Sequence, residues 1–133
     1  MPGRAGNMDM GSFKINGTEF GIGSIKLSLD NGLLNLQITG DNNAFDRLMD
    51  SGGSGWDWAL YAPKIYFNNV PYKSGILEID NSVLSKYDIA LYMMEYNDFT
   101  GTLEISGSNI NIKGNVGLMG KIMPVNVNAV NPQ

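Results

Sequence analysis

Hydrophobic and polar residues alternate along much of this chain, and short polar turns interrupt the alternation. A period of two places successive side chains on opposite faces of an extended strand, so alternation predicts strands with one buried face. Three of the turns contain asparagine or glycine, which tolerate the positive φ angles of tight hairpin turns. The pattern therefore predicts a chain built largely from β-hairpins.

The first two hairpins are predicted to turn at Asn16-Gly17 and at Asn31-Gly32. A two-residue loop at the first turn pairs Phe13 with Phe20, Lys14 with Glu19 and Ile15 with Thr18. At the second turn, aliphatic residues oppose one another on one face: Leu29 with Leu34, Leu27 with Leu36 and Ile25 with Ile38. A slip of one residue would oppose leucine with polar residues, so the sequence specifies this register well.

A third hairpin is predicted at Gly107-Ser108, where glycine in the first loop position suits a type II′ turn. It pairs Ile105 with Ile110, Leu103 with Ile112, Glu104 with Asn111 and Thr102 with Lys113. Gly21 and Gly23 lie between the first two hairpins. They allow the strands on either side to be one long strand that bends at a glycine corner.

Other elements are predicted from weaker patterns. Asp41 or Asn42 can cap a short helix near residues 43–50. Strands are predicted over Trp56–Tyr61 and Ile65–Phe67, and a turn at Asn68-Asn69 leads into a returning strand over Val70–Asp80 with a bulge at Ser74-Gly75. The last strand, Met123–Asn128, is expected at a sheet edge because Pro124 cannot donate to a ladder.

Residues 83–96 fit two structures. Val83, Tyr87, Leu91 and Met94 form a helical stripe that Ser82 could cap, whereas residues 87–96 also alternate as a strand buried on both faces. The strand interpretation is favoured for 87–96. With 133 residues, the chain is expected to form a flexible lead-in over 1–10 and one β domain over 11–130. The expected fold is mainly β: a single antiparallel β-sandwich or an up-and-down β-barrel, with one short helix.

Composition excludes several kinds of chemistry. Cysteine and histidine are both absent, which removes disulfides, thiolate metal sites and Ser-His-Asp triads. Glu78 and Asp80 share a face of a predicted strand, but the ordinary reading is two solvated acids. The acidic stretch Asp41–Asp50 lacks the spacing of a calcium-binding EF-hand. No catalytic residue, metal ligand or cofactor is therefore assigned, and a non-catalytic function is favoured over an enzymatic one.

The net charge is −4, and it is uneven. Residues 74–112 carry one lysine against six carboxylates, whereas no basic stripe of the kind that binds nucleic acid is visible. The composition argues against nucleic acid and membrane partners and favours a protein partner with basic groups. The N-terminal ten residues hold no apolar signal segment, which favours an intracellular location over secretion.

Aromatic side chains supply the best candidate binding residues. Five tryptophans and tyrosines lie within seventeen positions, and exposed rings on a sheet can anchor proteins or stack on sugars. Trp56 and Trp58 align with Leu60, which favours a core position for both, so the other strand face, with Tyr61 and Tyr66, is the better surface. The candidate partner-binding residues are Trp56, Trp58, Tyr61, Tyr66 and Tyr72, with the acids Glu95, Asp98 and Glu104.

Three functions remain in competition. The first is a non-catalytic protein-binding module, such as an inhibitor-like or immunity-like protein or an assembly subunit. The second is a carbohydrate-binding module with an aromatic platform of coplanar rings. The third is a small-ligand-binding β-barrel whose lumen would be lined by Ile25, Leu27, Leu36, Ile38, Leu103 and Ile112.

Overall fold

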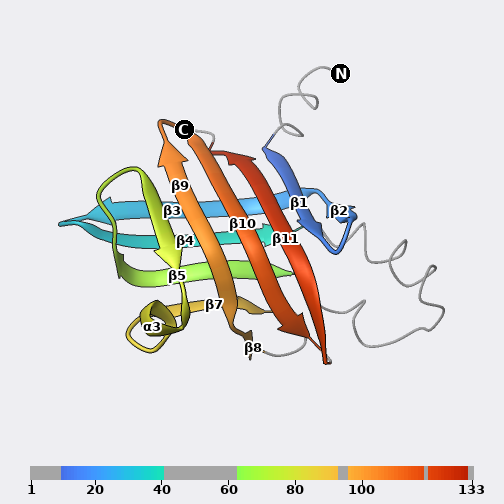
Figure 1. Ribbon diagram of the computed structural model, residues 1–133. Helices are drawn as coiled ribbons and strands as arrows, with labels where there is room; N and C mark the ends of the chain where they lie inside the picture. Colours follow the sequence, from blue (N-terminus) through green and yellow to red (C-terminus); the bar gives the residue numbers. More distant parts are fainter. Residues whose placement is uncertain (1–9, 41–62, 93–95, 119, 132–133) are drawn as a thin grey trace, which may run out of the picture.

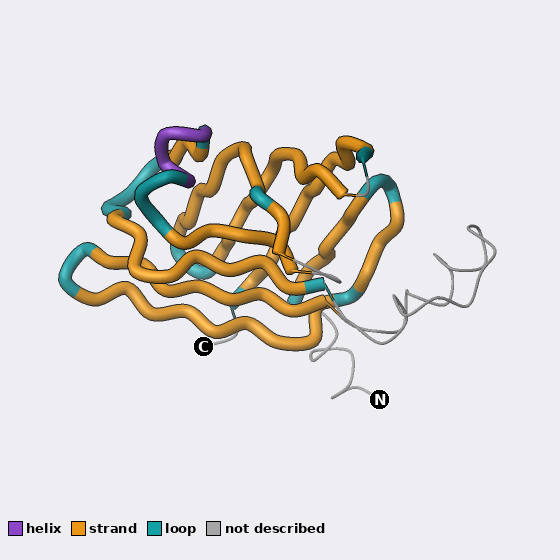
Figure 2. Tube along the Cα trace, turned by 90° about the horizontal axis from the view of Figure 1, so that it is seen from below, coloured by secondary structure: helices purple, strands orange, loops and turns teal. Residues whose placement is uncertain are grey.

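Two antiparallel β-sheets stack face to face in this protein, with the apolar core between them (Figure 1). The computed structural model describes residues 10–40, 63–92, 96–118 and 120–131. Figure 2 shows the sheets as two layers, and in Figure 1 their strands cross steeply. No ladder among the described strands joins the sheets into a barrel, so the sandwich, of the two predicted architectures, is the one observed.

The first sheet, sheet A, has the strand order β2-β1-β11-β10-β9-β6. Its strands are β1 (Gly11–Ile15), β2 (Thr18–Phe20), β6 (Ile76–Ile79), β9 (Phe99–Ser106), β10 (Asn109–Leu118) and β11 (Lys121–Val130). The second, sheet B, has the order β3-β4-β5-β7-β8. Its strands are β3 (Ile22–Asp30), β4 (Leu33–Gly40), β5 (Lys64–Pro71), β7 (Asp88–Tyr92) and β8 (Tyr96–Asn97).

The three predicted hairpins are confirmed residue by residue as β1–β2, β3–β4 and β9–β10. Asn16 and Gly17 have φ angles of 53° and 84°, and Asn31 and Gly32 have 56° and 76°. Two successive positive φ angles define the type I′ turn that matches strand twist. Gly107 has a φ of 62°, as expected for the first position of a type II′ turn.

The chain passes between the sheets at a glycine corner, as the sequence indicated. Phe20 ends β2 in sheet A and Ile22 begins β3 in sheet B, with Gly21 between them. The last crossing leads from sheet B to sheet A. There Asn97, the last residue of β8, is followed by Asp98 and then by β9. Asn97 is buried, and its side-chain amide donates to the carbonyl of Leu91 at 3.4 Å.

The predicted turn at Asn68-Asn69 is wrong, because β5 continues through it as one strand. Asn69 does have a positive φ of 53°, but it belongs to a bulge where the register with β4 shifts. The Asn35 side chain stabilises this bulge: its oxygen accepts from the Asn69 amide at 3.0 Å, and its amide donates to the Asn69 side chain at 3.1 Å. The expected return over residues 70–80 is therefore divided, with its second half forming β6 in sheet A.

The edge position predicted for the last strand is also wrong, because β11 lies between β1 and β10. Pro124 is tolerated there for a local reason. Its carbonyl accepts from the amide of Asn16 at 2.8 Å, so its missing N–H faces the same side, where β1 has already ended at Ile15. In an antiparallel ladder the N–H and C=O groups of one residue point to the same neighbouring strand. For Pro124 that strand is β1, which has ended at Ile15, so the missing N–H breaks no ladder hydrogen bond.

The strand favoured over residues 87–96 is observed only in part: β7 ends at Tyr92, and Tyr96 in β8 pairs back with Tyr92. The helix α3 (Asn81–Leu84) is a single turn that Asp80 caps, and β7 and β8 follow it. The Asp80 carboxylate accepts from the backbone amides of Ser82 and Val83 at 3.0 and 3.1 Å. The helix expected near 43–50 and the strand expected over 56–61 lie outside the described residues.

The core fills the space between the sheets. Four of the residues predicted to line a barrel lumen, namely Leu36, Ile38, Leu103 and Ile112, are buried members of this core, and Ile25 and Leu27 pack against it. The side chains of Phe13, Phe20, Phe67 and Phe99 are fully buried among them. The predicted lumen is therefore the interior of the sandwich.

Candidate functional site

Three tyrosines gather on the solvent-facing side of sheet B. Tyr66 lies on β5, Tyr92 on β7 and Tyr96 on β8, and the three are called the tyrosine cluster below. Tyr92 and Tyr96 are direct cross-strand partners, and Tyr66 pairs with Ala90, two residues before Tyr92. Side chains two apart on a strand share a face, so this register places all three rings on one side of the sheet.

The rings contact one another at steep angles. Tyr66 and Tyr96 meet edge to face, with centroids 6.0 Å apart and planes inclined at 82°. Tyr92 and Tyr96 have centroids 4.9 Å apart and an angle of 53°. Ala90 is only 7% exposed beside Tyr66, and its small side chain leaves room for the larger rings. Tyr96 is 70% exposed and is the outermost ring of the cluster.

The surroundings of Tyr66 favour its neutral phenol. The pKa of Tyr66 is raised from 10.0 to about 12, most strongly by partial burial and further by a hydrogen bond to the Tyr96 side chain and by electrostatic interaction with Tyr96 and Asp88. Asp88 is itself held by Asn68, whose side-chain amide donates to the Asp88 carboxylate at 2.8 Å. Tyr66 is therefore uncharged at neutral pH, and the Asp88 carboxylate lies beside it.

An open hollow adjoins the cluster on the same face. It has a volume of about 290 Å³ and lies over β3, β4 and β5. Its polar lining residues are Lys26, Ser28, Asn35, Gln37 and Asn68. Gln37 pairs directly with Tyr66, so the hollow begins at the edge of the cluster. Rings and hydrogen-bonding groups therefore form one continuous surface.

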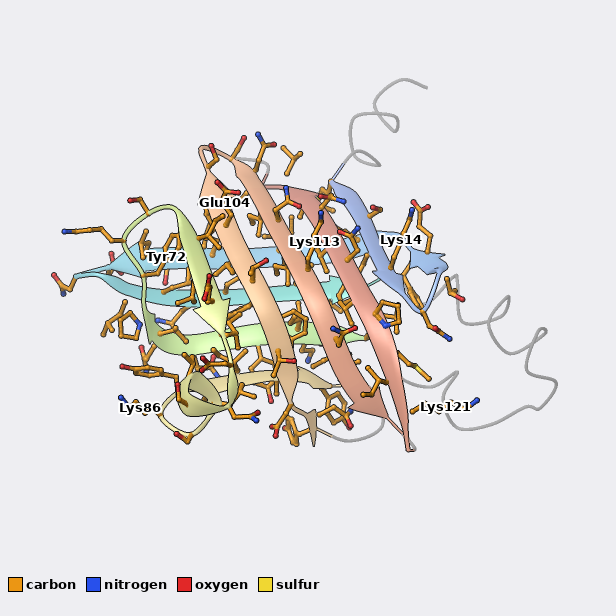
Figure 3. All side chains as sticks on the ribbon, in the orientation of Figure 1. Lys14, Tyr72, Lys86, Glu104, Lys113 and Lys121 are labelled. Carbon is orange, nitrogen blue, oxygen red and sulfur yellow. The ribbon has the colours of Figure 1, made fainter. Side chains whose placement is uncertain are left out.

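Of the predicted aromatic residues, Tyr66 is on this surface and Tyr72 is not. Tyr72 is 8% exposed and lies after β5, at the side of the sandwich (Figure 3). Its hydroxyl donates to the carbonyl of Gly75 at 2.8 Å and accepts from the amide of Ile105 on β9 at 3.0 Å. Tyr72 therefore links the two sheets, and its ring is not available to a partner.

The predicted acids do not form one patch among the described residues. Glu104 is exposed on the outward face of sheet A (Figure 3), whereas Asp98 is exposed at the crossing from β8 to β9. Glu78 is exposed on β6, and its suggested partner Asp80 is the cap of α3. The remaining predicted site residues, Trp56, Trp58, Tyr61 and Glu95, lie outside the described residues.

Sequence reasoning missed two members of the cluster, Tyr92 and Tyr96. The alternation over residues 87–96 does place Tyr92 on one face of a strand. What the sequence did not indicate is that β7 lies next to β5, because that pairing joins segments about 25 residues apart. The signal that could have found the cluster is the repeated tyrosine in a segment already favoured as a strand.

The described part of the molecule holds no group of three or more carboxylates arranged to bind a metal ion. Among the same residues, none of the helical segments has the length and apolar character needed to span a bilayer. Comparisons with known protein families, curated proteins and solved structures found no match. Any function must therefore be inferred from the geometry of the surface itself.

Proposed function

We propose that this chain is a non-catalytic protein-binding module, and that it contacts its partner through the tyrosine cluster on sheet B. The observation that supports this most directly is Tyr96, a large aromatic side chain 70% exposed at the edge of a sheet. Tyrosine is enriched among residues that dominate binding energy, because it buries a large rigid area and keeps a hydroxyl for hydrogen bonding.

The residues around Tyr96 are consistent with a role in binding a protein partner. Its ring contacts Tyr66 and Tyr92, so little conformational freedom is lost when a partner covers it. The adjoining hollow supplies amide and hydroxyl groups that can form the polar rim of an interface. The nearby charges have both signs, with Lys26 in the hollow and Asp88 beside Tyr66, so the partner surface need not be strongly basic.

The same geometry favours a protein over a polysaccharide at this face. A flat sugar platform needs rings that lie in one plane, whereas the described rings are inclined at 82° and 53°. Inclined rings form a ridged surface, which suits insertion between the side chains of a protein partner. The aromatic-platform alternative therefore has less support within the described residues than the protein-binding proposal.

The test is photo-crosslinking at a single position. Tyr96 is replaced with p-benzoylphenylalanine in the full chain, which is then irradiated in lysate from its source, and adducts are identified by mass spectrometry. The matched control carries the same group at Asn115, an exposed position on the outward face of sheet A. We expect one prominent adduct at position 96 and not at 115. Adducts only at 115, or at neither position, would overturn the proposal.

The identified partner then allows a quantitative test. Tyr96→Ala removes the exposed ring and is expected to weaken binding about 10- to 30-fold, the range of a hot-spot residue. Ile122→Ala removes a side chain that is 77% exposed on sheet A, and it should leave affinity unchanged. Equal loss in both variants would show that the contact is not centred on the cluster.

A further inference from the structure

The outward face of sheet A carries a second surface of different chemistry, an open polar groove of about 560 Å³. Pockets that bind small molecules have volumes of about 300–1,000 Å³. Among the residues that the structure describes, no aromatic, lysine or arginine side chain lines the groove. From this lining and its geometry we infer that the groove is a binding site for a small saccharide that carries no negative charge.

The sheet register explains how the groove is formed. Ser12, Asn128, Asn111 and Glu104 occupy neighbouring positions on β1, β11, β10 and β9, and form one wall. Val130, Asn109 and Ser106 form the other wall, two residues further along the strands. At a strand spacing of about 4.8 Å the first wall is roughly 14 Å long, and the walls are roughly 7 Å apart.

Between the walls lies bare backbone. Ala129 and Ile110 occupy the intervening positions, and both side chains are buried in the core, so only their main chain faces the groove. The groove therefore has a main-chain floor, and every residue of its two walls except Val130 is polar. A ring bearing hydroxyl groups can lie on such a floor and reach both walls at once.

The wall groups have hydrogen-bonding capacity available. The side chains of Asn109, Asn111 and Glu104 make no hydrogen bond or ion pair to other described residues. The amide of Asn128 donates to the Asn126 side chain at 3.3 Å, which leaves the Asn128 oxygen able to accept. Amides offer donors and acceptors together, and sugar hydroxyls require both.

The charge of the groove lining restricts which class of saccharide can bind. Glu104 lines the groove and makes no ion pair to another described residue, and no lysine or arginine is among the described lining residues. A uronic acid or a phosphorylated sugar would bring its negative charge to the Glu104 carboxylate and is disfavoured. A neutral sugar is accepted, and an amino sugar gains attraction from Glu104. The absence of stacking rings limits affinity, and we expect a dissociation constant on the order of 1 mM.

The experiment is an NMR titration of the full chain that follows backbone amides and asparagine side-chain amides. The neutral probes are glucose, cellobiose, maltose and chitobiose, and the charged probes are glucosamine and glucuronate. We expect at least one neutral probe to shift the signals of Asn109, Asn111 and Ala129. Glucosamine should bind more tightly than glucose, and glucuronate should not bind.

Two variants and a matched control locate the site. Asn111→Ala should weaken the best probe about 5- to 10-fold, whereas Asn115→Ala, on the same strand and face but outside the groove, should not. Glu104→Gln should abolish the preference for glucosamine and retain neutral binding. The inference is overturned if no saccharide shifts the groove signals, if shifts occur only at the tyrosine cluster, or if Asn111→Ala and Asn115→Ala lose affinity equally. It is also overturned if spermidine shifts these signals and the sugars do not.

Discussion

At the residue scale, a single hydroxyl group joins the two sheets. The Tyr72 side chain extends from the end of β5 in sheet B and bonds to Gly75 and to Ile105 of β9 in sheet A. Its backbone amide also donates to the carbonyl of Gly32 in the β3–β4 turn at 2.9 Å. One residue thus fixes the position of a hairpin tip relative to the opposite sheet. This role explains why a tyrosine, and not a phenylalanine, is present in a buried position.

Replacing Tyr72 with phenylalanine should therefore destabilise the fold, although the change removes only the hydroxyl group. The Ile105 amide loses its acceptor, and an unsatisfied buried donor costs about 1–3 kcal/mol. Urea unfolding should show a lower midpoint with an unchanged m-value. Tyr87→Phe is the control, because the Tyr87 hydroxyl has no hydrogen bond within the described residues. A Tyr72→Phe variant as stable as Tyr87→Phe would contradict the assigned link.

Tyr66 offers a second test at this scale. Its pKa is raised to about 12, and Tyr96 contributes to that shift. Tyr96→Phe should lower the pKa of Tyr66 towards 10.0 without reaching it, because partial burial, the largest cause, remains. NMR titration of the tyrosine ring signals measures this directly. An unchanged pKa of Tyr66 in the variant would show that the two hydroxyls do not interact.

The raised pKa also has a consequence for stability. A group whose pKa is higher in the folded state stabilises the fold fully below its unfolded pKa, here 10.0, and loses this contribution as the pH rises through about 12. Tyr66→Phe should therefore lose less stability than the wild-type protein between pH 10.0 and about 12. The free energy of unfolding of both proteins is measured at several pH values in this window. An equal decrease with pH in the two proteins would contradict the expectation.

At the scale of elements, a pair of facing glycines sets the contact between β9 and β10. Gly101 and Gly114 are cross-strand partners. A Cβ on Gly101, whose φ is +156°, would lie 2.0 Å from the Lys113 carbonyl oxygen. A Cβ on Gly114 would lie 2.7 Å from the ring of Phe99, which is fully buried. Gly114 therefore leaves room for the buried Phe99 ring, and Gly101 allows the close approach of the β10 main chain.

Gly101→Ala should consequently destabilise the protein by roughly 2–4 kcal/mol, since it combines backbone strain with a clash against main chain. Gly117→Ala on β10 is the matched control, because nothing lies within 4 Å of its Cβ position. Thermal unfolding of both variants compares them under one condition. A Gly101→Ala variant that unfolds at the wild-type temperature would show that β9 and β10 accommodate the added methyl group at little cost in free energy.

Strands and their register were predictable from the sequence where they depend on pairs of residues that lie close together along the chain. The register of the β3–β4 hairpin depends on residues close in sequence, and the alternation of leucine with polar residues specifies it. The strand β5 was divided at Asn68-Asn69 because two asparagines indicate a turn. The bulge there depends on Asn35, more than thirty residues away, and no local pattern reveals it. Pro124 misled in the same way, because its tolerance depends on where β1 ends.

At the scale of the whole molecule, the sequence predicted strands and hairpins but not which sheet each would join. In the up-and-down barrel that the sequence also allowed, consecutive strands would be neighbours, whereas the chain leaves sheet A after β2 and returns for β6 and again for β9 to β11. These crossings bring β7 beside β5 and so create the tyrosine cluster. They also place β1 beside β11 and so form the groove. Both candidate surfaces are products of long-range pairing, which explains why residue patterns alone did not locate them.

A shared core should make both sheets unfold together. Ile38 on β4 and Ile112 on β10 are fully buried in central strands of opposite sheets, in one cluster of contacting side chains. Because neither sheet can bury its apolar face without the other, opening either one exposes the whole core. Native-state hydrogen exchange should therefore give the amides of Ile38 and Ile112 the same opening free energy and the same dependence on denaturant. Edge strands such as β2 and β8 should open at lower cost. A lower free energy for Ile38 with a smaller denaturant dependence would mean that sheet B unfolds independently, and the sandwich would then comprise two cooperative units.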